Sequence, residues 1–268
     1  MAATKRTDTK TDNVVVLQNA YRGVLEALDQ VYRVFARHPP PTRLDASKVE
    51  DVDAIRSQLL GKPLASLTAD DLGRFAFGAP MTIGTDRDYR HFLPRMLELS
   101  LQLNGQPGLD PRTIGARLGY AGWRQWPVEE IAAIEALFAA AWVWRLASRP
   151  DHIEATAWLG GMAASGMDIN EALTAWEAAP SQWAWLHLAQ FVLTQPKRFS
   201  ATGLVAAGRW SDADTESTMV VSRWLKSEIL SERLVSVALS AEWPDDWSMD
   251  YLASAADCLD RLRPLSLP

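Results

Sequence analysis

The sequence predicts an all-α protein, either an α-solenoid-like stack of many helices or an irregular helical bundle. Apolar residues recur every three or four positions through most of the 268 residues, as on the buried face of an amphipathic helix. Residues that start and end helices interrupt this pattern at short intervals. We find no convincing strand and no fixed repeat period, so the stack is indicated by element length alone.

The first predicted helix covers residues 14–35. The run His38-Pro39-Pro40-Pro41 ends it, because proline has no backbone N–H and disfavours a helical residue before it. Residues 1–13 are rich in Thr, Lys and Asp, and they predict a disordered tail. A short second helix ends near residue 59.

Capping residues predict the next helix starts. Thr68 offers a hydroxyl cap, and Asp70 and Asp71 then place negative charge at the positive end of the helix dipole. We expect Asp86 to cap the following helix, and Pro94 inside that helix predicts a kink or a break.

The remaining chain predicts a single domain from residue 14 to 268, with a possible subdivision near residue 150. Asp110-Pro111 predicts a helix start with proline at its first position. The most apolar helix begins after Trp126-Pro127 and ends near residue 149, which favours a central place in the fold. Further helices are predicted over residues 151–165, 168–179, 181–195, 211–229, 231–241 and 247–262.

Composition argues against several functions. No uncharged apolar run approaches the ~18–20 residues of a membrane helix, and no apolar segment of a secretory signal opens the chain. The single cysteine, Cys258, excludes an internal disulfide and a cysteine-based metal site. These observations predict a cytoplasmic protein without cofactor or metal.

Charge is divided unevenly along the chain. Residues 1–150 carry 19 Lys/Arg and 17 Asp/Glu, whereas residues 151–268 carry 8 and 16, which gives net charges of +2 and −8. A nucleic-acid-binding protein normally presents a concentrated basic surface. The acidic half therefore argues against nucleic acid and favours a basic protein as partner, although a solvated acidic surface without any partner is the commoner case.

The densest polar cluster is Asp86-Arg87-Asp88-Tyr89-Arg90-His91. On a helix, Asp86 and Arg90 are four residues apart and pair, and Asp88 lies three residues before His91. One interpretation is a pocket in which His91 acts as acid or base beside Arg87, Tyr89 and Arg90, with apolar walls from Phe75 and Phe77. The structural interpretation, which we favour, is a salt-bridged helix start.

Other polar residues carry weaker signals. Asp151, His152 and Glu154 lie together, but only Asp151 and Glu154 have the spacing of ligands on one helical face. His187 has apolar neighbours, which predicts a buried, hydrogen-bonded side chain. The small residues 160–166 lack the Lys-Ser/Thr of a phosphate loop and indicate a close helix crossing or a turn.

Tryptophan is concentrated in the acidic half. Most of these side chains are expected in the core, while one or two exposed on a helical surface would form a recognition patch. We single out Trp176, Trp183 and Trp185 as candidate binding residues. The full set considered is Trp176, Trp183, Trp185, Trp210, Trp224, Trp243 and Trp247.

One stretch resembles a group of bacterial all-helical proteins. It runs Lys62-Pro-Leu-Ala-Ser-Leu-Thr-Ala-Asp-Asp-Leu-Gly-Arg-Phe-Ala-Phe and continues at Asp88-Tyr-Arg-His-Phe-Leu-Pro-Arg-Met-Leu-Glu-Leu. The resemblance covers about residues 15–105 and implies a bacterial cytosolic protein without a known activity. Members often carry closely spaced cysteines before this stretch, whereas residues 43–50 contain none, so no metal or redox role is transferred.

Three functional hypotheses follow. The first is a non-enzymatic protein-interaction module that uses the acidic, Trp-rich half to bind a basic partner, such as a toxin or a regulatory protein. The second is a small-molecule binder or enzyme with a polar site around Asp86–His91, and the third is a structural domain of a larger assembly. The sequence leaves catalytic activity and oligomeric state open.

Overall fold

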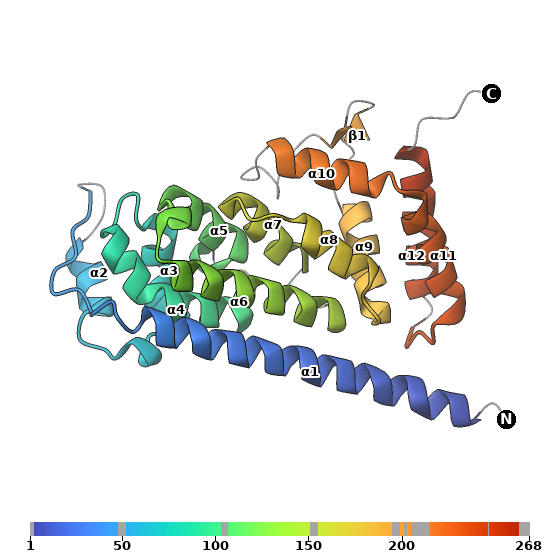
Figure 1. Cartoon of the computed structure of the whole chain (residues 1–268), viewed down its shortest axis with the longest axis horizontal. Coiled ribbons are helices and arrows are strands. Elements are labelled where there is room, and N and C mark those ends of the chain that lie inside the picture. The colour runs from blue at the N-terminus through green and yellow to red at the C-terminus, as the bar shows by residue number, and fades with distance from the viewer. Residues whose placement is uncertain are drawn as a thin grey trace. The chain divides into compact units, whose positions relative to one another are not determined.

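The computed structural model describes residues 3–47, 52–102, 107–150, 155–194, 199–200, 203–204, 215–245 and 247–262 (Figure 1). The all-α prediction is confirmed, because helices make up most of these residues. The described helices are α1 (Ala3–Phe35), α2 (Val52–Leu59), α3 (Ala69–Gly78), α4 (Asp86–Gln102), α5 (Pro111–Tyr120), α6 (Val128–Ala147), α7 (Ala155–Ser165), α8 (Asn170–Glu177), α9 (Gln182–Thr194), α10 (Thr215–Leu225), α11 (Glu228–Ser240) and α12 (Trp247–Leu262).

The minor elements are three short 3-10 helices and one small antiparallel hairpin. They are η1 (Leu64–Ser66), η2 (Pro107–Leu109), η3 (Trp123–Gln125), β1 (Phe199–Ser200) and β2 (Gly203–Leu204). In the hairpin, Phe199 pairs with Leu204 and Ser200 with Gly203. None of the described helices combines the length and the apolar character that a bilayer crossing requires.

The contacts divide the chain into two compact units. Unit 1 comprises Met1–Tyr21, Trp142–Thr156 and Asp168–Pro268, and unit 2 comprises Arg22–Ala141 and Ala157–Met167. The sequence placed a possible subdivision near residue 150, whereas three helices, α1, α6 and α7, contribute residues to both units.

Helix α1 begins earlier than the sequence indicated. It starts at Ala3, within the segment for which a disordered tail was predicted. Nucleation is the unfavourable step of helix formation, and extension adds about one hydrogen bond for each residue fixed. The apolar residues 14–35 therefore supply a nucleus from which the polar residues before them extend.

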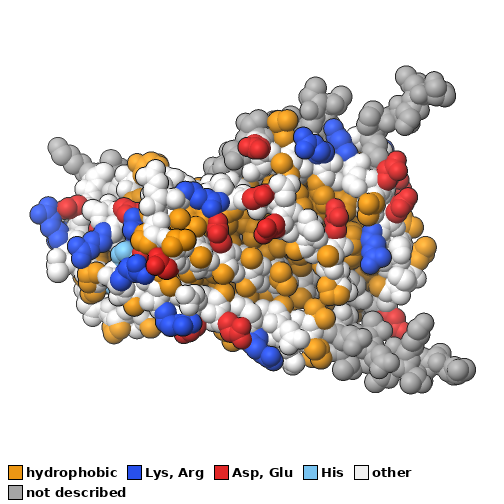
Figure 2. Space-filling model, in the orientation of Figure 1, with side chains coloured by type: hydrophobic (Ala, Val, Ile, Leu, Met, Phe, Trp, Pro, Cys, Tyr) orange, Lys and Arg blue, Asp and Glu red, His pale blue; other side chains and the backbone are white. Residues whose placement is uncertain are grey.

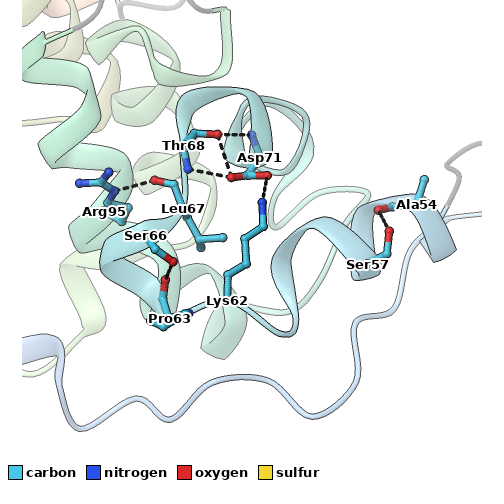
Figure 3. Close-up of polar contacts among 9 residues, drawn as sticks. All are labelled: Ala54, Ser57, Lys62, Pro63, Ser66, Leu67, Thr68, Asp71 and Arg95. Atoms are coloured by element: carbon cyan, nitrogen blue, oxygen red, sulfur yellow. Dashed lines mark hydrogen bonds and ion pairs between the residues drawn. The ribbon is translucent and has the colours of Figure 1, made fainter.

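The predicted start of α3 at Thr68 is confirmed (Figure 3). Asp71 N–H donates to Thr68 Oγ1 (3.3 Å), and the Asp71 carboxylate accepts from the backbone N–H of Thr68 (2.9 Å). Lys62 Nζ donates to the same carboxylate at 2.6 Å. The Lys62 and Thr68 hydrogen bonds stabilise the charged form and lower the pKa of Asp71 to about 2.

Helix α4 departs from the prediction at its cap. Its cap is Thr85 rather than Asp86, because Asp88 N–H donates to Thr85 Oγ1 and the Asp88 carboxylate accepts from Thr85 N–H (2.8 Å). The helix continues without a break through Pro94, which is itself buried. Burial of the neighbouring apolar side chains Phe92, Leu93, Met96 and Leu97 offsets the hydrogen bond that proline cannot donate.

An aspartate accepts a backbone hydrogen bond at the start of two later helices, α5 and α8. Asp110 caps α5 through Arg112 N–H (2.9 Å), with Pro111 at the first helical position, as predicted. Asp168 accepts from Asn170 N–H (2.9 Å) ahead of α8, although the residue at the cap position is Ile169.

In unit 2, glycines allow α5 and α7 to approach with their backbones almost in contact. A Cβ atom on Gly115 would lie 2.1 Å from the carbonyl oxygen of Gly161, and one on Gly161 would lie 2.5 Å from that of Pro111. Both clashes are with backbone, which has little freedom to move. This confirms the close crossing predicted from the small residues 160–166.

Unit 1 has an aromatic core. Trp142 and Trp176 meet edge to face at a centroid distance of 5.0 Å, and Phe191 and Trp224 complete the cluster around Trp176. The indole N–H of Trp142 donates to Ala172 O (2.9 Å) and that of Trp176 to Ala184 O (2.7 Å). Buried tryptophans are stable here because each polar atom has a backbone acceptor.

Candidate functional site

The most concentrated polar structure in unit 2 surrounds Glu130, in the first turn of α6. Its side chain is 0% exposed. His38 Nε2 lies 2.9 Å from Glu130 Oε1, and Arg37 Nε lies 3.8 Å from the same oxygen. Arg90 Nη1, from α4, lies 3.6 Å from Glu130 Oε2. A buried carboxylate is costly unless cations and hydrogen bonds surround it, and these three side chains supply them.

Arg90 connects Glu130 to two further residues. Its Nη2 pairs with Asp86 Oδ2 at 2.6 Å, which confirms the pairing predicted from their four-residue spacing. Its guanidinium carbon lies 4.3 Å from the ring centroid of Trp126. This stacking is a cation–π contact, and it holds the arginine in one orientation. We call Asp86, Arg90, Trp126, Glu130 and His38 the Glu130 node.

His91 lies beside the node and contacts it through the backbone. Its Nδ1 donates to the carbonyl oxygen of His38 at 2.9 Å, and its ring lies edge-on to Phe92. The donor holds the segment after α1 against α4. The Asp88 carboxylate, which was considered as an orienting partner for His91, is instead bonded to Thr85.

The other predicted pocket residues do not converge. Arg87 is exposed, whereas Tyr89 is fully buried and its hydroxyl donates to Ile114 O at 3.4 Å. Burial raises the pKa of Tyr89 above its usual range, so the phenol stays neutral. Of the expected walls, Phe75 is buried against Phe92, and Phe77 is exposed beside Arg117.

Four buried polar atoms of the node have no hydrogen-bond partner among the described residues. They are the acceptors Asp86 Oδ1 and Glu130 Oε2 and the donors Arg90 Nε and Trp126 Nε1. Leaving one buried polar group unsatisfied costs about 1–3 kcal/mol.

Metal binding has no support from the described residues, in which no three His, Cys, Asp or Glu side chains are placed to hold an ion. Asp151, His152 and Glu154 lie outside the described residues, as does Trp210. His187 is buried, and its Nε2 lies 3.0 Å from Ser148 O, as predicted for a core histidine. Cys258 is partly exposed on α12.

The candidate tryptophans separate into core and surface. Trp176 and Trp185 are buried in unit 1 and are not available to a partner. Trp183 is half-buried, with Trp243 edge-on at 6.0 Å and the Arg149 guanidinium 5.6 Å from its ring centroid. The side-chain amide of Gln182 donates to Glu242 O (3.1 Å), which ties the start of α9 to the loop between α11 and α12.

Helices α11 and α12 carry five of the exposed large apolar residues of unit 1, and others lie on α1, α6 and α10. These two helices pack against each other and against α9, and a loop of six residues joins them. Leu239 is 77% exposed at the end of α11, and Trp247 is 51% exposed at the start of α12. We call the following exposed residues of the two helices and their loop the hairpin surface: Glu232, Val235, Leu239, Glu242, Trp247, Met249, Asp250 and Asp257.

The hairpin surface mixes apolar and acidic side chains. Residues 215–262 contain nine acidic and four basic residues. Figure 2 shows acidic, basic and hydrophobic side chains over this part of unit 1. The usual composition of an exposed helical face is polar, so large apolar side chains among carboxylates make the hairpin surface a candidate binding surface.

Sequence analysis did not single out Glu130, Trp126 or Leu239. Glu130 stands in the first turn of α6, where acids are common, and its buried contact is with His38, which is 92 residues away in sequence. Leu239 lies five residues after Leu234, which is about 140° around the helix. It is therefore off the buried face that Leu230, Leu234 and Ala238 form, and this spacing is a sequence signal for its exposure.

No family model matches the chain, and neither curated proteins nor solved structures give a significant match. The resemblance to a group of bacterial all-helical proteins therefore stays a prediction. Function has to be argued from the two sites themselves.

Proposed function

We propose that the chain is a non-enzymatic protein-interaction module and that it binds a basic protein through the hairpin surface. The observation that carries this proposal is the exposure of Leu239 and Trp247 at the loop end of α11 and α12. Large side chains of this kind lose contact with water when a partner covers them, and tryptophan is enriched among residues that dominate binding energy.

The charge of the surface supports a basic partner. Glu232, Glu242, Asp250 and Asp257 are exposed on the same two helices and loop. Opposite charge on a partner would accelerate association and favour one orientation, whereas an acidic partner would be repelled. A helix with apolar residues on one face and Lys or Arg on its flanks fits both parts of the surface.

The tryptophans give the surface a rigid support. Trp183 and Trp243 meet beside the loop, and Arg149 both faces Trp183 and pairs with Asp245 at 3.1 Å. A loop fixed in this way loses less entropy when a partner binds. Of the three tryptophans selected from the sequence, Trp183 is the one that remains in the proposed function.

The test compares two surface variants for binding. The wild-type chain, Leu239→Asp and Val128→Asp are immobilised and used to capture proteins from the native cell, and the captured protein is then purified and titrated. Val128 is the control because it is 73% exposed in unit 2. We expect Leu239→Asp to weaken binding at least tenfold and Val128→Asp to leave it unchanged.

Salt provides the second criterion. Raising the salt concentration from 0.05 to 0.5 M shortens the screening length from more than ~10 Å to a few ångströms. Binding to a basic partner should then weaken several-fold. The proposal would be contradicted if both substitutions weakened binding of the captured protein equally. It would also be contradicted if the affinity did not change with salt concentration.

The alternative is a small-molecule binder or enzyme with a polar site around Asp86–His91. We favour it less because the polar groups of that region are largely engaged with one another. Arg90 pairs with Asp86 and Glu130, and His91 with His38 O. Asp88 serves as a cap. Such a network stabilises a fold, and a substrate would have to displace its internal pairs.

A further inference from the structure

We propose that the Glu130 node binds one internal water molecule, which completes the hydrogen bonds of the buried carboxylate. The inference concerns unit 2 and is independent of the interaction role assigned to the hairpin surface. It begins from the four unpartnered atoms, Asp86 Oδ1, Arg90 Nε, Trp126 Nε1 and Glu130 Oε2, each shielded from bulk solvent.

The four atoms match the bonding capacity of water. Two are carboxylate oxygens and accept hydrogen bonds, and two are N–H groups and donate them. A water molecule donates two hydrogen bonds and accepts two. It therefore bonds to Glu130 Oε2 and Asp86 Oδ1 through its hydrogens and accepts from Arg90 Nε and Trp126 Nε1.

The geometry places the four residues around one guanidinium group. Arg90 Nη2 is 2.6 Å from Asp86 Oδ2, and Arg90 Nη1 is 3.6 Å from Glu130 Oε2. The second distance exceeds a hydrogen bond, and separations of this length between polar groups are commonly bridged by water. The Trp126 ring covers the guanidinium at 4.3 Å.

Charge excludes most other small ligands. Glu130 and Asp86 carry two negative charges, and Arg90 and Arg37 carry two positive charges beside them. An added anion would face the carboxylates, and an added cation would face the guanidinium groups. A neutral ligand with two donors and two acceptors is left, and the buried position of all four atoms favours the smallest one.

The chain contains its own controls for testing this site. Trp158 Nε1 is buried and has no hydrogen-bond partner among the described residues, but its ring packs edge-on against Phe138 at 5.2 Å. Trp123 Nε1 is buried and donates directly to Ser165 O at 2.8 Å. Trp158 is an unpartnered indole whose ring contacts another aromatic ring, and Trp123 represents a protein-to-protein hydrogen bond.

The experiment measures magnetisation transfer between water and the tryptophan indole protons in the intact, isotope-labelled protein. We expect a rotating-frame NOE to water at Trp126, with the sign of direct proximity rather than exchange, and none at Trp158 or Trp123. The variant Trp126→Phe should remove that signal and assign it. A Trp126 indole without a water signal, or with one no stronger than that of Trp158, would overturn the proposal.

A high-resolution crystal structure of the wild-type protein provides a second measurement. It needs no variant, so unfolding of a variant cannot affect the result. We expect one solvent atom at about 3 Å from both Glu130 Oε2 and Arg90 Nε. A structure in which these atoms bond directly to each other or to another side chain would overturn the proposal.

Discussion

The Glu130 node buries its central carboxylate, whereas the hairpin surface exposes its carboxylates to solvent. In the node, Glu130 is fully buried beside Arg90 and His38, and Arg37 lies next to the node. On the hairpin surface, Glu232, Asp250 and Asp257 remain exposed next to large apolar side chains. Acidic and basic residues nearly balance in the first 150 residues, and some of them pair inside the fold. The three acids named on the hairpin surface stay exposed, where a partner can reach them.

The sharpest test of this contrast removes one acid from each region. Breaking a buried ion pair leaves uncompensated charge and costs roughly 3–5 kcal/mol, so Glu130→Ala should lower the free energy of unfolding by that amount. Glu232→Ala, on the exposed face of α11, should change it by less than about 0.5 kcal/mol. Urea unfolding followed by tryptophan fluorescence measures both. Similar losses for the two variants would remove the distinction between the regions.

A second test uses backbone contact rather than charge. Gly115→Ala should destabilise unit 2 by up to about 3 kcal/mol, because the new Cβ would lie 2.1 Å from Gly161 O. Gly23→Ala in α1 has nothing within 4 Å of the new Cβ and should stabilise the helix by about 0.5–1 kcal/mol. Thermal unfolding of the two variants gives shifts of opposite sign. A neutral Gly115→Ala would show that α5 and α7 separate easily.

The sequence could predict features that depend on neighbouring residues, and it could not predict features that depend on contacts between distant residues. Local signals were sufficient for most helix starts, because Thr68 with Asp71 and Asp110 with Pro111 act within three residues. The Asp86 cap was wrong since a hydroxyl at Thr85 competes for the same role and Asp88 is placed to complete the box.

The candidate sites depended on tertiary structure. Glu130 meets His38 across 92 residues, and no periodicity carries that information. Trp176 and Trp185 look in sequence like Trp247, yet the first two fill the core and the third is half exposed. Which tryptophans remain exposed is decided by which helices pack over them.

A third test concerns Asp71, whose charge is local to a helix start. Its pKa is lowered from 3.8 to about 2 in the folded chain, so the folded state favours the carboxylate. The resulting stability is fully present above pH 4 and is lost as the pH falls towards 2, by roughly 2 kcal/mol. Unfolding measured across this range should show a shallower acid loss for Asp71→Asn than for wild type. Parallel curves would mean that the Lys62 and Thr68 contacts do not persist in solution.

The smallest effect is expected where the proposed function lies. Leu239 is 77% exposed, so Leu239→Ser removes little buried apolar surface and should change the free energy of unfolding by less than about 0.5 kcal/mol. Leu234→Ser, on the buried face of the same helix, serves as the matched control and should cost several-fold more. The affinity for the captured partner should fall strongly in Leu239→Ser, although this variant remains folded. If Leu239→Ser unfolds the chain as readily as Leu234→Ser, the side chain belongs to the core and the hairpin surface loses its main contact.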